Sequence, residues 1–162
     1  PGIDIVVPTT VVGSGTVSQP SFTTLEFETG IANNTLLFGS MHQGEHASAQ
    51  VKLNGIGAIS SFTDGEKYNI GVGRKFNDSL SATLSYTTEE GSSATGTSLL
   101  SPTNGTDTYA LGINYSTESV DIAFGYAMSS FGDKAVTTAY GTGNFTNNDA
   151  TTTGLRIKFK LP

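Results

Sequence analysis

Apolar and polar residues alternate with a period of two along most of the chain. Because successive side chains of a β-strand point to opposite faces, this pattern predicts seven strands of about ten residues each. A strand that crosses a bilayer at a tilt of about 45° needs roughly 9–11 residues. The predicted strands have that length, and they cover residues 21–31, 35–45, 67–76, 80–90, 107–116, 120–131 and 152–161.

The connections between the predicted strands alternate between very short and long. Residues 32–34, 77–79 and 117–119 are rich in the residue types that favour tight turns. Residues 44–66, 91–106 and 132–151 form longer polar segments. Short turns on one side and long loops on the other are typical of outer-membrane β-barrels.

Each predicted strand has one apolar face and one small or polar face. We expect the apolar faces to contact lipid, with aromatic residues near both strand ends, as at a membrane boundary. The strands of a soluble β-sandwich also alternate between apolar and polar residues. Such a protein has no reason, however, to place all its short turns at one end and all its long loops at the other. The residues predicted to face lipid are Tyr68, Ile70, Val72, Leu84, Tyr86, Leu111, Ile113, Ile122, Phe124, Ile157 and Phe159.

The opposite faces carry a small number of charges, which we expect to point into a lumen. They are Glu26, Glu28, Asp121, Arg156 and Lys158, with Lys160 at the end of the last strand. The antiparallel register predicts that Asp121 lies near Lys158 or Lys160 at the short-turn end. Opposed charges on neighbouring strands are ordinary stabilisers, so we assign these charges a structural role.

Composition narrows the function classes. The chain contains 20 glycines and only 14% charged residues, and it predicts no helical segment. A net charge of −6 argues against a nucleic-acid partner, and the absence of cysteine excludes disulfides and thiolate metal sites. The sequence begins at Pro1 without a charged and apolar leader, so we expect any export signal to lie outside it.

No constellation of residues predicts an enzyme, a metal site or a cofactor. His42 and His46 have the spacing of a zinc-binding helix, but the strand-to-loop pattern around Gly44 provides no helix, so we expect two solvated loop histidines. Glu89 and Glu90 are adjacent on a strand and point opposite ways. We expect Asp133, Asn147, Asn148 and Asp149 to be hydrophilic loop residues rather than calcium ligands.

Several runs of the sequence together carry a family resemblance. They cover residues 25–40, 68–76, 109–115, 124–126, 131–133 and 147–150. In this order they resemble the outer-membrane long-chain fatty acid and hydrophobic compound transporter family, the FadL and TodX group. The resemblance extends over nearly all of the chain from Ser21 onward.

The resemblance implies an all-β, antiparallel transmembrane β-barrel of fourteen strands with an N-terminal plug, of which this chain is the C-terminal half. Residues 1–20 would be a loop or partial strand that leads into the barrel portion, residues 21–162. The implied function is passive, porin-like transport of long-chain fatty acids or other hydrophobic compounds across the bacterial outer membrane. The implied partners are membrane lipid, hydrophobic small molecules and the missing N-terminal half, where we expect the ligand-binding residues to lie.

Two alternatives remain open. The chain could be a complete eight-stranded outer-membrane barrel with a structural or adhesive role, with an eighth strand supplied by residues 3–7 or 10–17. It could also be a soluble all-β binding module, in which case the apolar faces would meet in a water-excluded core.

Overall fold

The computed structural model describes residues 14–55, 57–58, 62–91, 104–138 and 141–160. Its main element is a seven-stranded antiparallel sheet with the strand order β12-β9-β8-β7-β6-β3-β2. The all-β fold predicted from the alternating pattern is therefore confirmed. The strands are β2 (Phe22–Ala32), β3 (Thr35–Gly44), β6 (Gly65–Lys75), β7 (Leu80–Glu89), β8 (Thr106–Ser116), β9 (Val120–Phe131) and β12 (Asn148–Phe159).

The seven predicted strands coincide with the seven strands of this sheet. Their ends agree within two residues, except that β12 begins at Asn148 instead of residue 152. The predicted end of that strand at Leu161 lies outside the described residues. Each strand pairs with the sheet strands before and after it in the chain, so the sheet is an up-and-down meander.

The short turns obtain their geometry from polar side chains. The Asn77 side-chain oxygen accepts hydrogen bonds from the backbone N–H groups of Ser79 and Leu80 at 2.9 and 2.8 Å. Thr117 does the same for Ser119 and Val120 at 3.3 and 3.1 Å. Asn34 has a φ of 57°, a left-handed conformation that Asn tolerates well. These turns hold neighbouring strands in register.

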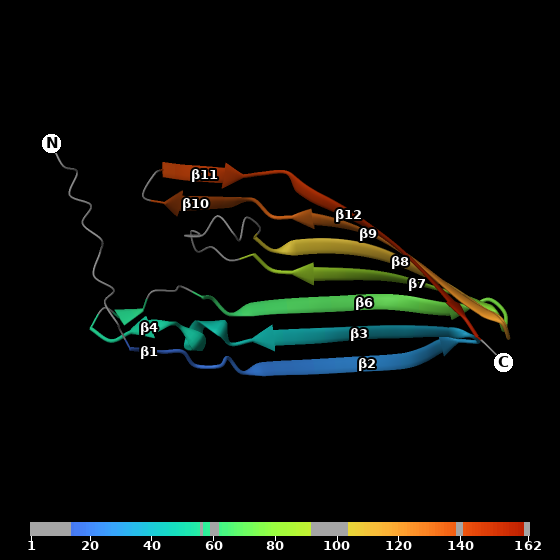
Figure 1. Ribbon diagram of the computed structural model, residues 1–162. Coiled ribbons are helices and arrows are strands. Elements are labelled where there is room, and N and C mark those ends of the chain that lie inside the picture. The colour runs from blue at the N-terminus through green and yellow to red at the C-terminus, as the bar shows by residue number, and fades with distance from the viewer. Residues whose placement is uncertain (1–13, 56, 59–61, 92–103, 139–140, 161–162) are drawn as a thin grey trace.

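The long connections contain small elements that the sequence pattern did not predict. β10 (Lys134–Thr138) and β11 (Gly141–Phe145) form a hairpin. β4 (Lys52–Leu53) and β5 (Gly57–Ala58) form a three-stranded sheet with β1 (Gly15–Thr16), which precedes β2, and η1 (His46–Ala49) is a single 3-10 turn. Figure 1 shows β1, β4, β10 and β11 at the end of the main sheet opposite the short turns.

Among the described residues, no helix has both the length and the apolar character needed to cross a membrane.

No eighth strand joins the main sheet within the described residues. β1, which falls in the segment 10–17 expected to supply one, pairs with β4 instead. The other expected source, residues 3–7, lies outside the described residues. The described sheet therefore has two edges, β2 and β12, and each is hydrogen-bonded to only one neighbour.

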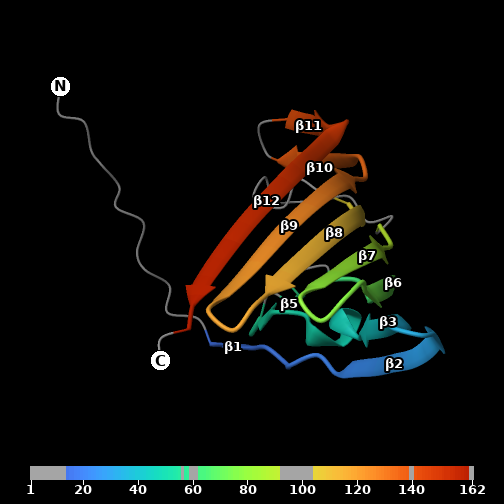
Figure 2. The same cartoon turned by 90° about the vertical axis from the view of Figure 1, so that its right-hand side faces the viewer.

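The described part of the chain has almost no hydrophobic core. Only Ala49 and Val136 are buried hydrophobic residues, and neither belongs to the main sheet. Large apolar side chains on the sheet are exposed instead, such as Leu84 at 56% and Phe159 at 73%. Figure 2 shows the reason, because the seven strands form one curved layer with no second layer packed against it.

Candidate functional site

The strand register divides the main sheet into two chemically different faces. Ile70, Tyr86, Tyr109 and Met128 stand opposite one another on successive strands, and so do Val72, Leu84, Leu111 and Tyr126. All of the residues predicted to face lipid lie on this face, which we call the apolar face. Alternation along the strands places the small and polar residues on the other face.

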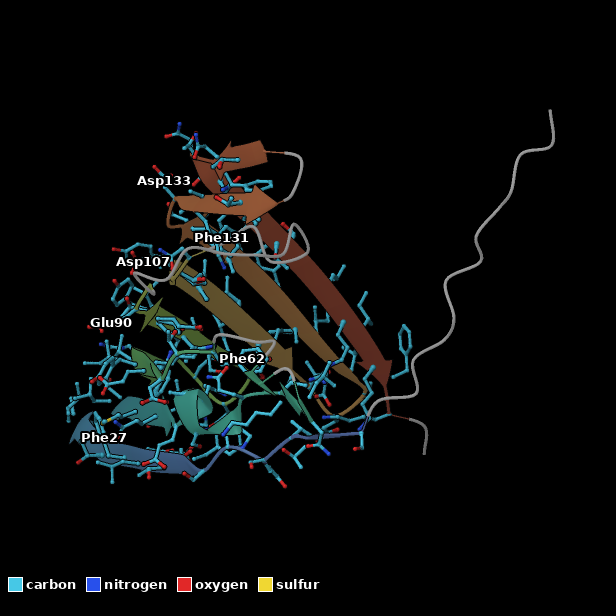
Figure 3. All side chains as sticks on the ribbon, turned by 90° about the vertical axis from the view of Figure 1, so that its left-hand side faces the viewer. Phe27, Phe62, Glu90, Asp107, Phe131 and Asp133 are labelled. Atoms are coloured by element: carbon cyan, nitrogen blue, oxygen red, sulfur yellow. The ribbon has the colours of Figure 1, made fainter. Side chains whose placement is uncertain are left out.

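The apolar face is the convex side of the curved sheet. Asp107 belongs to the apolar face, because it pairs with Thr88 of that face, and Phe131 belongs to the other face. In Figure 3 Asp107 lies on the outer side of the curved sheet and Phe131 lies toward its inside. The five residues Ile70, Leu84, Ile113, Phe124 and Ile157 do not meet in a core. Instead they are spread over the outside of the layer, where Ile70 is 50% exposed and Ile157 is 51% exposed.

Tyrosines border the apolar face at the long-loop end. The Tyr86 hydroxyl donates a hydrogen bond to Asp107, and the Tyr68 hydroxyl donates one to Glu66 at 2.5 Å. The ring centroids of Tyr86 and Tyr109 lie 4.9 Å apart. The apolar face thus ends in aromatic rings whose polar tips bond to carboxylates beyond it.

The concave face contains a row of glycines that crosses the sheet. Register pairing lines up Gly30, Leu36, Gly73, Thr83, Gly112, Gly125 and Gly154, one from each strand. We call this set the glycine row. Its five glycines and the small residues of the adjacent row leave a groove of about 460 Å³, lined by Thr83, Ser85, Ala110, Gly112, Gly125, Ala127, Thr152 and Gly154 among others.

No side chain fills the space above the glycines of the groove floor, and an aromatic ring closes one end of the groove. A Cβ atom added at Gly125 or Gly154 would meet no atom within 4 Å. The Phe38 ring instead lies directly over Gly71, where no side chain could fit without displacing it. Phe38 therefore forms the wall of the groove at its β3 end.

The charges predicted to face a lumen all lie on the concave face by register. Lys158 stands opposite Asp121, and Glu28 stands opposite Phe38. The expected ion pair is formed by Lys160, whose Nζ lies 2.7 Å from the Asp121 carboxylate. The same Nζ donates to the Thr117 carbonyl at 2.8 Å, so Lys160 also ties the last strand to the β8–β9 turn.

Arg156 belongs to the next row along β12, opposite Ala123. Its side chain is exposed and makes no hydrogen bond or ion pair with the described residues. Glu26 and Glu28, near the other edge of the sheet, line a second groove of about 490 Å³ together with Phe38, Ser40 and Asn69. The concave face is thus acidic along β2 and basic along β12.

The two histidines lie at the long-loop end of the concave face, and one expectation about them is wrong. His42 belongs to β3, so the expectation of a loop residue is wrong for it, whereas His46 begins the short turn η1 within the long connection after β3. The Phe22 ring stacks on His42 at 5.5 Å and meets His46 edge-on at 5.7 Å. Within the described ranges, no three His, Cys, Asp or Glu residues are grouped to hold a metal ion.

The expectation of loop residues is wrong for Asn148 and Asp149, because pairing with β9 makes them the first two residues of β12. The Asp133 carboxylate accepts a hydrogen bond from the Asn147 backbone N–H at 3.2 Å, next to the start of β12. Glu89 stands opposite Lys67 on the concave face. The glycine row itself was missed, because glycines on different strands form a row only after the register is known.

Comparisons with known proteins agree with this architecture. No family model matches the sequence, and no curated protein matches it. Among solved structures, a FadL homologue from Pseudomonas aeruginosa matches with a TM-score of 0.60 at 15% sequence identity. The match covers 85% of this chain and 34% of the FadL homologue, so the chain spans about a third of that protein. The seven-stranded sheet therefore has the fold of part of a FadL-type β-barrel.

Proposed function

We propose that this chain is the C-terminal part of a fourteen-stranded barrel in the bacterial outer membrane. The intact barrel passively transports long-chain fatty acids or other hydrophobic compounds and is not an enzyme. Residues 21–162 contribute seven strands of its wall, and residues 1–20 lead into them. The resemblance in sequence and the match to part of a FadL homologue both support this assignment.

One observation carries the membrane assignment. Large apolar side chains of the apolar face are exposed on six of the seven strands, while the concave face carries small residues and charges. Each Å² of apolar surface left in water costs about 25 cal/mol, so an exposed face of this extent favours a lipid environment. A closed wall with a lipid-facing outside and a more polar inside is the arrangement of a transmembrane barrel.

The two sheet edges support the missing half as a partner. β2 and β12 have 11 and 12 residues, and their outer backbone groups have no partner strand in the main sheet. In lipid each unsatisfied backbone group is costly, so both edges require further strands. An additional segment of the same protein supplies them most simply.

The transport proposal requires no chemistry in the wall. A hydrophobic compound leaves water, enters the lumen and continues into the membrane down its concentration gradient. The rate then depends on affinity for the lumen and on the opening of the wall. The ligand class comes from the resemblance to the transporter family, and it is the part of the proposal that most needs a direct test.

The test is uptake in cells that lack the gene. We expect deletion to slow the uptake of radiolabelled oleate, and a plasmid copy to restore it, while uptake of a hydrophilic disaccharide stays unchanged. Unchanged oleate uptake would reject the transport function. An adhesion defect in the same strain would favour the structural or adhesive barrel instead.

A further inference from the structure

We propose that ion pairs join both edges of the main sheet to the strands that complete the barrel. The strand beside β2 carries lysine or arginine at the concave-face positions next to Glu26 and Glu28. The strand beside β12 carries aspartate or glutamate next to Arg156 and Lys158. We call these four residues the edge charges. The inference rests on the proposed function, because it specifies the chemistry of the partner that closes this wall.

The edge charges have opposite sign on the two edges of the sheet. Glu26 and Glu28 occupy consecutive concave-face positions of β2, and so do Arg156 and Lys158 on β12. All four side chains are exposed. Two like charges at consecutive positions of one face lie about 7 Å apart along the strand, so each pair repels itself until counter-charges lie beside it.

The strands inside the sheet do not supply these counter-charges. Glu26 and Glu28 stand opposite a serine and a phenylalanine of β3, and Arg156 stands opposite an alanine of β9. These three form no hydrogen bond or ion pair with the part of the chain that the structure describes. Lys158 stands opposite a carboxylate, but that carboxylate already forms the ion pair with Lys160. The edge charges are therefore available to a strand on the open side of each edge.

The direction of the edge strands identifies the kind of partner. β2 runs toward the short turn that joins it to β3. β12 runs the same way, because the Lys160 backbone N–H beyond its end donates to the Ser119 carbonyl of the β8–β9 turn at 2.9 Å. An antiparallel partner at either edge must therefore run from the short-turn end to the long-loop end.

A second copy of this chain does not meet that requirement. In the same orientation its two edge strands also run toward the short-turn end, so they could pair with β2 or β12 only in parallel. An inverted copy would place its long loops on the opposite side of the membrane. A further segment of the same protein, with an odd number of strands, fits both edges in antiparallel pairing.

Opposite charges on the two edges also direct each new strand to the correct edge. Residues that face each other on neighbouring strands attract when their charges differ and repel when they match. A strand with lysines on its concave face is thus attracted to β2 and repelled by β12. The register at β12 has little other guidance, because its outward residues Asp149, Thr151 and Thr153 are polar.

The amino-acid sequence of the whole protein gives the first test. We expect the strand before β2 to carry at least one lysine or arginine at the positions that pair with Glu26 and Glu28. We expect the first strand of the barrel to carry at least one aspartate or glutamate at the positions that pair with Arg156 and Lys158. Uncharged or like-charged residues at either set of positions would overturn the ion pairs at that edge.

Charge reversal in the full-length protein tests whether the pairs stabilise the closed barrel. Arg156→Glu combined with Lys158→Glu is expected to lower the ratio of closed to unclosed protein about tenfold, because repulsion replaces attraction at two positions. Heat-dependent gel mobility after folding into lipid vesicles measures this ratio. Changing the partner acids to lysine in the same protein should restore closure, whereas that change alone should also impair it.

Two controls separate the edge from the rest of the face. Thr83→Glu combined with Ser85→Glu adds two acids at consecutive concave-face positions of β7, an inner strand, and should leave closure unchanged. Arg156→Lys combined with Lys158→Arg keeps both charges and should close normally. Equal loss of closure in the β7 control, or no rescue by the reversed partner, would overturn the inference.

Further outcomes separate this inference from the proposed function. If oleate uptake depends on the gene but charge reversal leaves closure unchanged, the transport function stands and the edge pairs do not. If the reversed partner rescues closure while oleate uptake is independent of the gene, the edges close as inferred and the transport function falls. Mixed barrels from two co-expressed, differently tagged copies would assign the edges to a second copy and reject the partner.

Discussion

At the scale of single residues, glycine has two different uses on the concave face. Gly125 and Gly154 leave open space, whereas Gly71 makes room for the Phe38 ring of the neighbouring strand. The Leu84 carbonyl oxygen would also lie 2.9 Å from a Cβ atom at Gly71. The first pair shapes the groove, and the second site fixes the position of its end wall.

Gly71→Ala should therefore destabilise the wall. Overpacking at a tight site typically costs about 1–3 kcal/mol of unfolding free energy. Gly65→Ala in the same strand is the control, because a Cβ atom there meets no atom within 4 Å. The measurement is urea-induced unfolding in lipid vesicles. Equal stability of the two variants would show that the Phe38 ring moves aside at little cost.

The Asp121–Lys160 ion pair is the best-supported electrostatic contact of the described sheet. Both side chains are about one-third exposed, at 35% and 36%. Solvent screening keeps such pairs weak, so we expect a small stabilising coupling energy from Asp121→Asn, Lys160→Met and the double variant. Unfolding free energies of the four proteins give this value.

The Lys75–Asp78 pair provides the comparison. It lies in a short turn and is far more exposed, with a separation of 2.9 Å. The hydrogen bond and charge of Lys75 lower the pKa of Asp78, so any stabilisation is present above the ordinary pKa of that carboxyl and disappears as the pH falls through the lowered one. Because the Asp78 side chain is completely exposed, we expect this contribution to stability to be small. A larger coupling energy for Lys75–Asp78 than for Asp121–Lys160 would contradict the view that the more buried pair is the stronger one.

At the scale of strands, adjacent residues of β7 should respond in opposite ways to the same substitution. Leu84 lies on the apolar face and Ser85 on the concave face. An arginine near the bilayer midplane on the lipid side costs about 2–4 kcal/mol, whereas an arginine in the lumen does not.

We expect Leu84→Arg to reduce membrane insertion and stability, while Ser85→Arg inserts normally. Each variant is folded into lipid vesicles. Gel mobility then measures the fraction that inserts, and urea titration measures its stability. Equal tolerance of the two substitutions would contradict the assignment of the faces.

The strands were predictable from the sequence to the extent that their apolar residues alternate. Val120–Phe131 was predicted with both ends correct, because Val120, Ile122, Phe124 and Tyr126 mark one face from its start. The beginning of β12 was missed. Its first outward residues, Asp149, Thr151 and Thr153, are polar, so pairing with β9 and not a hydrophobic pattern extends this strand.

The smaller elements and the groove could not be predicted, for a different reason. β1, β4 and β5 have two residues each, too few to show any period. The groove depends on register across several strands, and the contacts of Lys160 depend on how close β12 lies to the β8–β9 turn. Alternation identifies the faces, but contacts between strands decide which residues share a site.

At the scale of the whole molecule, the described sheet has two edges, β2 and β12, and each pairs with a neighbour on one side only. Long unpaired edges promote aggregation or pairing with another strand. We expect the isolated chain to aggregate in detergent, and co-expression with the preceding part of the protein to give a monodisperse, heat-modifiable barrel. Size-exclusion chromatography and gel mobility distinguish these states. A monodisperse, heat-modifiable species from the chain alone would instead support the small complete barrel.

The β10–β11 hairpin continues β9 and β12 beyond the rim of the sheet (Figure 1). Val136 in β10 is completely buried, although the main sheet has no buried hydrophobic residue. In the proposed barrel this hairpin stands on the long-loop side, so a macromolecule that binds it acts directly on the last two strands, next to the edge at which the sheet must close.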